Sequence, residues 1–225
     1  MEPITQETVT SSIDLLEIID CGLSGYGETL QLQQDLHRQR CLGEIPDTVL
    51  IVEHPPVITL GTRQTANKLL KSGEELARLQ IEVVKTNRGG GATAHNPGQL
   101  VLYPILDLRG IGLDITEYID TLQAIGIELL ERLGVQARRK KDFPGLWVDG
   151  KKIASIGVRV CKGITTHGMA ININNDLSIF DYIIPCGIDG VGMTSILKET
   201  GSEISMVDVK NILSKLLGKY FARLG

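Results

Sequence analysis

The chain has 225 residues, of which 42% are hydrophobic and 22% are charged, and this balance indicates a globular protein with a sizeable core. The formal net charge of −4 argues against a nucleic-acid partner, because binding to phosphates needs a basic excess. No apolar run is long enough to span a membrane, and the first residues lack the pattern of a signal peptide. We therefore expect a cytoplasmic protein.

Short strands and helices alternate in the first hundred residues. Strands are expected where β-branched and aliphatic residues cluster, at residues 13–19, 47–52, 57–60 and 81–85. Helices are expected at residues 27–40 and 72–79, and the second begins with a capping box of Ser72 and Glu75. Residues 1–12 are expected to form a polar, flexible tail, followed by one domain over residues 13–225.

The second half of the chain combines hairpins with longer helices. Its predicted strands are residues 100–108, 146–148, 152–160 and 166–173, and its predicted helices are residues 114–133, 177–183 and 205–217. Asp149-Gly150 between two apolar runs is the strongest short signal for a hairpin. Hairpin-linked strands with irregularly inserted helices predict an α+β fold with a mixed, mostly antiparallel sheet and flanking helices.

Residues 88–99 (RGGGATAHNPGQ) concentrate glycines and turn residues between two predicted strands. Three consecutive glycines cost backbone entropy on folding, so an ordered run requires a reason, and close approach of the backbone to a ligand is one. A long flexible hairpin loop is the alternative. The segment lacks the lysine of a phosphate-binding loop and the spacing of a dinucleotide-binding turn, so it does not predict a nucleotide site.

The four cysteines and the histidines do not form a metal-binding pattern. The cysteine spacings match no zinc motif, and a cytoplasmic chain keeps scattered cysteines reduced. His54, His95 and His167 lie beside turns without the spacing or the carboxylates of a metal site. We therefore expect neither a metal nor another cofactor.

Two residues are candidates for covalent chemistry. Cys186 lies between Pro185 and Gly187, which hold the backbone in a defined turn, and a thiol displayed in this way can attack an acyl carbonyl. Lys152 follows the Asp149-Gly150 turn, and a lysine that points inward among small residues has the environment of a general base. A solvated lysine and a buried structural cysteine are the alternatives.

Six short motifs follow one another between residues 53 and 187. In chain order they are EHPPVITLG (53–61), RGG (88–90), HxPGQ (95–99), GKKIASIG (150–157), HG (167–168) and PCG (185–187). Their order and spacing resemble those of the lipoyl(octanoyl) transferase family. Each motif alone is weak, but the resemblance covers roughly residues 45–197, well over half of the chain.

Members of that family move an octanoyl group from acyl carrier protein to a lysine of a lipoyl domain. The resemblance implies the fold of biotin and lipoate protein ligases, a thioester on Cys186 and acid–base assistance by Lys152. It implies acyl carrier protein as the donor, and lipoyl domains of 2-oxoacid dehydrogenase complexes and the glycine cleavage H protein as acceptors. It also implies an acyl and pantetheine pocket lined by Arg88, Gly89, Gly90, Gly91, Ala92, Thr93, Ala94, His95, Ser155, Ile156, Gly157, Gly168, Met169 and Ala170.

The chain departs from the family pattern at two positions. Ala94 stands where an aromatic residue is usual, so we expect it to reshape the pocket wall. Asn96 stands where a glycine is usual, and we expect it to accept the left-handed conformation that a turn requires. An ATP-dependent lipoate or biotin ligase of the same fold and a non-catalytic binder of acylated carrier domains are the alternative functions.

Overall fold

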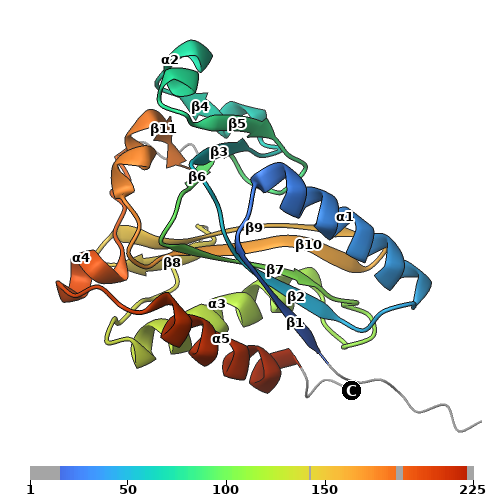
Figure 1. The fold of residues 1–225 in the computed structure, drawn as a ribbon. Coiled ribbons are helices and arrows are strands. Elements are labelled where there is room, and N and C mark those ends of the chain that lie inside the picture. The colour runs from blue at the N-terminus through green and yellow to red at the C-terminus, as the bar shows by residue number, and fades with distance from the viewer. Residues whose placement is uncertain (1–15, 142, 186–189, 222–225) are drawn as a thin grey trace, which may run out of the picture.

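The computed structural model describes residues 16–141, 143–185 and 190–221, so the expected tail at residues 1–12 and Cys186 lie outside the described part. Six strands form the central sheet in the order β1-β2-β7-β10-β9-β8 (Figure 1). β1 pairs with β2 in parallel, and the other neighbours in this sheet are antiparallel. The strands are β1 (Glu17–Leu23), β2 (Thr48–Glu53), β7 (Gln99–Ile105), β8 (Gly145–Val148), β9 (Lys151–Cys161) and β10 (Ile164–Asn172).

Two smaller sheets lie above the central one in Figure 1. β3 (Val57–Leu60) runs parallel to β5 (Glu82–Lys85) and antiparallel to β6 (Thr93–His95). β4 (Lys68–Leu69) and β11 (Ile183–Ile184) form a separate antiparallel pair. The predicted α+β fold with a mixed, mostly antiparallel sheet is confirmed. The sequence did not predict β6, which makes a strand of part of the glycine-rich segment.

Local sequence signals set the ends of several helices. The helices are α1 (Tyr26–Leu42), α2 (Gly73–Arg78), α3 (Ile115–Arg132), α4 (Ile196–Thr200) and α5 (Met206–Phe221), with 3-10 turns η1 (Gln64–Ala66) and η2 (Leu177–Tyr182). The predicted capping box of α2 is confirmed, because Ser72 Oγ accepts from the Glu75 amide while the Glu75 carboxylate accepts from the Ser72 amide. Of the helices described, none is both long and apolar enough to cross a membrane.

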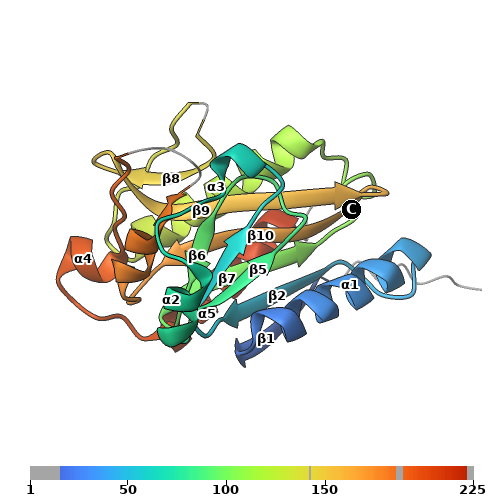
Figure 2. The ribbon, with the colours of Figure 1, turned by 90° about the horizontal axis from the view of Figure 1, so that it is seen from above.

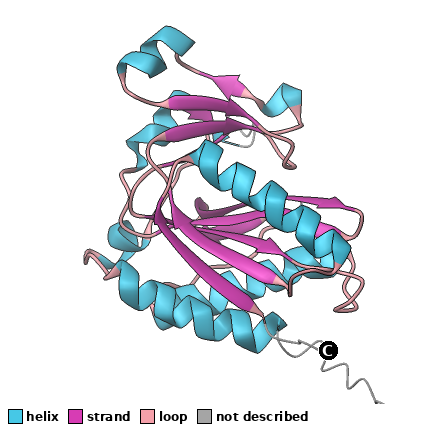
Figure 3. Ribbon diagram, turned by 45° about the vertical axis from the view of Figure 1, so that its right-hand side comes forward, coloured by secondary structure: helices cyan, strands magenta, loops and turns pink. Residues whose placement is uncertain are grey.

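The central sheet has helices on both faces. α3 and α5 cover one face, and α1 with the smaller sheets covers the other (Figures 1 and 3). The alternation of side chains along β2 follows this arrangement: Val49 and Ile51 pack in the α3–α5 core, whereas Leu50 and Val52 pack in the α1 core. Viewed from above, α1 runs alongside β2 (Figure 2), and it packs against β7 and β10 of the central sheet.

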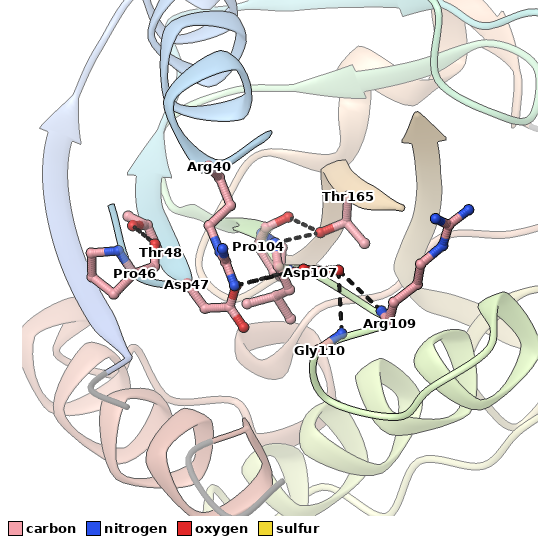
Figure 4. Close-up of polar contacts among 10 residues, drawn as sticks. Arg40, Pro46, Asp47, Thr48, Pro104, Asp107, Arg109, Gly110 and Thr165 are labelled. Atoms are coloured by element: carbon pink, nitrogen blue, oxygen red, sulfur yellow. Dashed lines mark hydrogen bonds and ion pairs between the residues drawn. The ribbon is translucent and has the colours of Figure 1, made fainter. Parts of the chain in front are cut away.

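Polar contacts fix the C-terminal end of α1 against the central sheet (Figure 4). Arg40 Nε donates to Asp47 Oδ1 at 2.6 Å, and the same carboxylate oxygen accepts from the Asp107 amide at 2.9 Å. A second contact between neighbouring strands joins Thr165 Oγ1 to the Pro104 carbonyl at 2.6 Å. α1 therefore has a defined position on the sheet, and its first turn reaches the site described next.

Candidate active site

A narrow pocket lies between the central sheet and the three-stranded sheet, beside the start of α1. Its volume is about 30 Å³, so only a narrow space is open between these elements. β7, β9 and β10 supply one wall, and β6 with the residues before it supplies the other. The lining residues are Tyr26, Arg88, Gly90, Thr93, His95, Val101, Tyr103, Ser155, Ile156, Gly157, His167, Gly168, Met169 and Ala170.

Glycines around this pocket allow backbone segments of the protein to approach one another. A Cβ atom on Gly91 would lie 2.4 Å from the Ala66 carbonyl oxygen, and one on Gly168 would lie 2.2 Å from the Leu102 carbonyl oxygen. Gly90 has a φ of 90°, which favours glycine. The close contact at Gly91 that leaves no room for a Cβ atom is with the protein itself.

Arg88 is held in the pocket wall by the three-stranded sheet. Its guanidinium donates to the Thr59 carbonyl at 2.7 Å and to Thr59 Oγ1 at 2.8 Å, and its side chain and backbone are only 7% exposed. The next residue, Gly89, donates its amide to the Val158 carbonyl at 3.0 Å. These bonds attach the glycine-rich segment both to β3 and to β9, so the wall is fixed on two sides.

A chain of hydrogen bonds joins the pocket to the start of α1. His54 Nδ1 lies 2.8 Å from the Ser24 carbonyl, so this nitrogen carries the proton and donates it. His54 Nε2 is then the acceptor for the Tyr103 hydroxyl at 2.8 Å. Tyr26, in the first turn of α1, stacks on the His95 ring with 6.0 Å between centroids. The aromatic side of the pocket is thus a connected set of neutral rings.

Burial keeps the pocket histidines uncharged at neutral pH. Burial lowers the pKa of His95 to about 3 and the pKa of His167 to about 4, and it also lowers the pKa of His54. His95 Nδ1 lies 2.7 Å from Gln99 Oε1 and is therefore the protonated nitrogen, which leaves Nε2 as an acceptor. Imidazoles that resist protonation to this degree are poor general bases, because they do not retain a proton.

Lys152 is a buried residue at one end of the pocket wall. It is 1% exposed, whereas its neighbour Lys151 is exposed, so the alternative of a solvated lysine is wrong. Its Nζ lies 5.5 Å from the centroid of the Trp147 ring. Its amide donates to the Gly192 carbonyl at 2.9 Å. Lys152 lies three residues before Ser155 on β9, at the end of the strand nearer α4 (Figure 1).

The remaining candidate, Cys186, lies outside the described residues. Pro185 and Gly192, on either side of it in the sequence, line one groove together with Lys151. The described cysteines are Cys21, Cys41 and Cys161, and none of these three lines the pocket.

Comparison with known proteins identifies the family. The model of the lipoyl protein ligase A/B catalytic domain matches residues 25–218. An octanoyltransferase of Rubrobacter xylanophilus is 46% identical over 191 residues, which are 84% of this chain and 86% of the relative. Octanoyltransferase LIP2 of Arabidopsis thaliana mitochondria is 42% identical over 195 residues, 86% of this chain and 83% of the relative. This chain belongs to the octanoyltransferase family. It is an acyltransferase.

Solved structures of more distant proteins share the fold. LipL1 of P. falciparum in complex with lipoate superposes with a TM-score of 0.73 at 14% identity, over 93% of this chain and 63% of that chain. A putative lipoate protein ligase of T. acidophilum with bound lipoic acid gives a TM-score of 0.67 at 18% identity, over 91% of this chain and 85% of that one. The expected likeness of the octanoyltransferase to lipoate ligase folds is confirmed.

The expected substrate residues of this octanoyltransferase do not all line the pocket. Arg88, Gly90, Thr93 and His95 line it, and so do the residues of β9 and β10 at 155–157 and 168–170. Gly89, Gly91, Ala92 and Ala94 are absent from the lining. Strand alternation explains the last two, because Thr93 and His95 face the pocket while Ala92 and Ala94 pack in a separate core with Ile58 and Leu76.

The two departures from the octanoyltransferase pattern have local explanations. Ala94 is fully buried in that separate core, so it does not shape this pocket as expected. Asn96 does not take the left-handed conformation that the sequence suggested, and the turn places Gly98 there instead, with a φ of 86°. The Asn96 side chain donates to the Asp176 carbonyl at 2.8 Å, which ties the turn to η2.

Sequence reasoning missed Tyr26, Val101 and Tyr103 in the octanoyltransferase pocket. Tyr26 is the first residue of α1, and Tyr103 lies in a strand that is otherwise aliphatic except for Gln99 and Pro104. A tyrosine in a buried strand needs a partner for its hydroxyl, and this need is the only sequence signal that points to Tyr103. His167 was noticed as a histidine beside a turn, without a role in the site.

Proposed function

We propose that this enzyme transfers an octanoyl group from acyl carrier protein to a lysine of a lipoyl domain, through a thioester on Cys186. The lipoyl domains of 2-oxoacid dehydrogenase complexes and the glycine cleavage H protein are the proposed acceptors. The supporting observation is the convergence of three distant segments, residues 88–95, 155–157 and 168–170, on one mostly apolar pocket, with the buried Lys152 three residues before Ser155 on β9. A narrow, mostly apolar pocket suits an acyl chain better than a charged ligand.

The proposed reaction has two acyl transfers. In the first, Lys152 takes the proton of the Cys186 thiol, and the sulfur attacks the carbonyl of the donor thioester. The bond between that carbonyl and the pantetheine sulfur breaks, and the pantetheine thiolate takes the proton back from Lys152. In the second, Lys152 accepts a proton from the acceptor lysine as its nitrogen attacks the new thioester, which forms the amide and releases the Cys186 thiolate to be reprotonated.

Two features of the described site support Lys152 as the acid–base group. The pocket histidines take up no second proton at neutral pH, because burial lowers the pKa of His95 to about 3 and that of His167 to about 4. Lys152 is buried, and its backbone is bonded to Gly192 and Thr194, six and eight residues after Cys186 in the sequence. We propose that this pairing brings the two reactive groups together.

Donors for the developing oxyanion are more restricted than the sequence suggested. The amide of Gly89 is already bonded to the Val158 carbonyl at 3.0 Å, so it is not free to stabilise an oxyanion. We propose that the donor is a backbone amide of Gly90 or Gly91, or of Gly187, which lies outside the described residues.

The basic run at residues 138–141 is a proposed docking site for the acidic carrier protein. Arg138, Arg139, Lys140 and Lys141 are exposed, although Arg139 is bonded to Asp120 at 3.0 Å. Opposite charges speed the encounter of two proteins and make its rate depend on salt. We expect Arg138→Glu with Lys141→Glu to lower kcat/KM for the carrier-bound donor at low salt, and the difference from the wild type should shrink as salt rises.

Intact-mass measurement of the acylated enzyme tests the proposed mechanism. Incubation with octanoyl-acyl carrier protein should add one octanoyl group, and Cys186→Ala should abolish the adduct. Cys161→Ala is the matched control, because Cys161 is a partly buried cysteine that does not line the pocket, and its loss should leave the adduct unchanged. Persistence of the adduct in Cys186→Ala would overturn the assignment of the nucleophile.

A second pair of variants tests the base. Lys152→Met should lower octanoyl transfer by about a hundredfold or more, the usual effect of losing a general acid–base group. Lys151→Met changes the adjacent, exposed lysine and should retain activity. Transfer from free octanoate and ATP, with none from the carrier protein, would favour the ligase alternative, and binding of the carrier-bound acyl group without any transfer would favour the non-catalytic one.

A further inference from the structure

A second cavity lies beyond the end of the acyl pocket. Its volume is about 170 Å³, and it lies between α1 and the outer part of the β9–β10 hairpin. Its lining residues are Leu30, Gln33, Gln34, His37, Asn87, Arg159, Cys161, Thr166 and His167. Only His167 is shared by the two sets of lining residues.

Three separate elements pass from one cavity to the other in the same direction. α1 contributes Tyr26 to the pocket and Leu30 to the cavity beyond, one turn further along. β9 contributes residues 155–157 to the pocket, and Arg159 and Cys161 to the cavity beyond. In the segment before β6, Arg88 lines the pocket and Asn87 lines the cavity beyond. Because Lys152 lies before residue 155 on β9, the second cavity is at the end of the pocket away from Lys152.

The His167 imidazole stands at the boundary between the two spaces. Its register partner on β9 is Val158, between the residues that line the pocket and those that line the cavity beyond. Its Nε2 lies 2.8 Å from Asn87 Oδ1 and donates to it, and its ring packs edge-on against Tyr103 with 6.4 Å between centroids. Its amide donates to Gln33 Oε1 at 2.8 Å. Contacts from α1, β7 and the β5–β6 segment therefore hold this side chain in place.

The backbone of His167 adopts a conformation that favours glycine. Its φ is 57°, in the left-handed region, and a non-glycine residue held there carries some strain. The next residue, Gly168, is the one at which a Cβ atom would collide with the Leu102 carbonyl. Histidine is one of the non-glycine residues enriched in this region, and the contacts of its side chain hold it there.

We infer that His167 is the distal wall of the acyl pocket and sets the longest acyl chain that the enzyme accepts. This inference rests on the proposed function, because it assumes that the acyl chain enters from the Lys152 end. A chain that fits ends against the imidazole. A longer chain would need the space beyond, which the ring and its bond to Asn87 close off. The ring is neutral at pH 7, so an apolar chain end that meets it does not desolvate a charge.

Replacement of His167 by glycine should join the two cavities and favour longer chains. Each additional buried methylene stabilises binding by about 0.8 kcal/mol, which corresponds to about fourfold in affinity. For His167→Gly we therefore expect the ratio of kcat/KM for decanoyl over octanoyl donors to rise about fifteenfold, since two methylenes are added. His167→Asn, a smaller residue that also tolerates the left-handed region, should show a smaller rise in the same direction.

The matched control is Lys162→Gly, at the tip of the same hairpin. Lys162 has a φ of 55°, so its replacement by glycine makes the same backbone change as at His167. Lys162 lines neither cavity. This variant should keep the wild-type order of chain lengths. Thermal unfolding shows whether each variant is folded, and His167→Asn decides the question if His167→Gly does not fold.

The possible results distinguish the inference that His167 limits chain length from the proposed transfer reaction. An unchanged decanoyl-to-octanoyl ratio in a folded, active His167→Gly or His167→Asn enzyme would overturn the inference and leave the proposed function intact. If the wild type transfers no acyl group from any carrier-bound donor, the proposed function fails. Calorimetric binding of free octanoate and decanoate to the same proteins then tests the wall: a shift toward decanoate in His167→Gly supports it, and equal shifts in His167→Gly and Lys162→Gly refute it.

Discussion

Acidification from about pH 7 to about pH 5 should destabilise the protein through its buried histidines. Burial lowers the pKa of His95 to about 3 and that of His167 to about 4, from an ordinary value of 6.5. Below about pH 6.5 the unfolded chain therefore takes up protons that the folded chain does not. The stabilisation is fully present above that pH and is lost as the pH falls toward the folded pKa values. His54, whose pKa burial also lowers, contributes in the same direction.

The expected size of the effect is large for one domain. Each histidine contributes about 1.4 kcal/mol per pH unit once its unfolded form is protonated, so His95 and His167 together give about 4 kcal/mol between pH 7 and pH 5. Net stabilities of domains are about 5–15 kcal/mol, so this loss is a substantial fraction. The pH range also avoids carboxylates with lowered pKa values: the contacts of Glu128 with Lys219 and Tyr220 lower its pKa to about 2, and it titrates below this range.

Urea unfolding at several pH values checks this reasoning. The free energy of unfolding should fall steadily between pH 6.5 and pH 5, with an unchanged dependence on urea concentration. His167→Asn removes one of the titrating groups and should reduce the pH dependence by about 2 kcal/mol over the whole range. A free energy of unfolding that stays constant from pH 7 to pH 5, or a His167→Asn profile equal to that of the wild type, would refute the attribution.

Further predictions concern the fold. Gly168→Ala should destabilise the protein by about 3 kcal/mol or more, because its Cβ would lie 2.2 Å from the Leu102 carbonyl oxygen. Gly27→Ala, in α1 with no atom within 4 Å of the added Cβ, should instead stabilise it by about 0.5–1 kcal/mol, and chemical denaturation measures both changes. Asp47→Asn should cost about 1.5–3 kcal/mol by weakening the bond to Arg40, and Arg40→Met in the same background should cost little more if the two residues act as one unit.

The sequence predicted the elements whose signals are local. The predicted capping box at Ser72 sets the start of α2, and the helix predicted to begin at residue 114 has a capping box of Asp114 and Glu117, because the residues that make each box are three apart in the chain. The Asp149-Gly150 hairpin also formed as predicted, with φ values of 45° and 82° at the two turn residues. In each case, a few neighbouring residues determine the local structure.

The second sheet and the aromatic side of the pocket depend on distant pairings and could not be predicted in the same way. β3 pairs in parallel with β5, more than twenty residues later in the chain, and no single stretch of sequence indicates that register. Tyr103 reads as a core residue of β7 until the fold brings His54 to its hydroxyl. Lys152 is the opposite case, because alternation along its strand left two outcomes and only packing against Trp147 and Gly192 decided that it is buried.

The bond between the Gly89 amide and the Val158 carbonyl has a consequence for how the pocket tolerates sequence change. It joins the two walls through backbone atoms, and a Cβ on Gly157 would already lie 2.9 Å from the Gly89 carbonyl. The spacing of the walls is therefore set by main-chain contact and does not vary with the size of neighbouring side chains. Substitutions elsewhere can change the shape of the pocket, while the distance between these two walls stays constant. A protein built in this way can diverge in its core and still hold a chain of the same thickness.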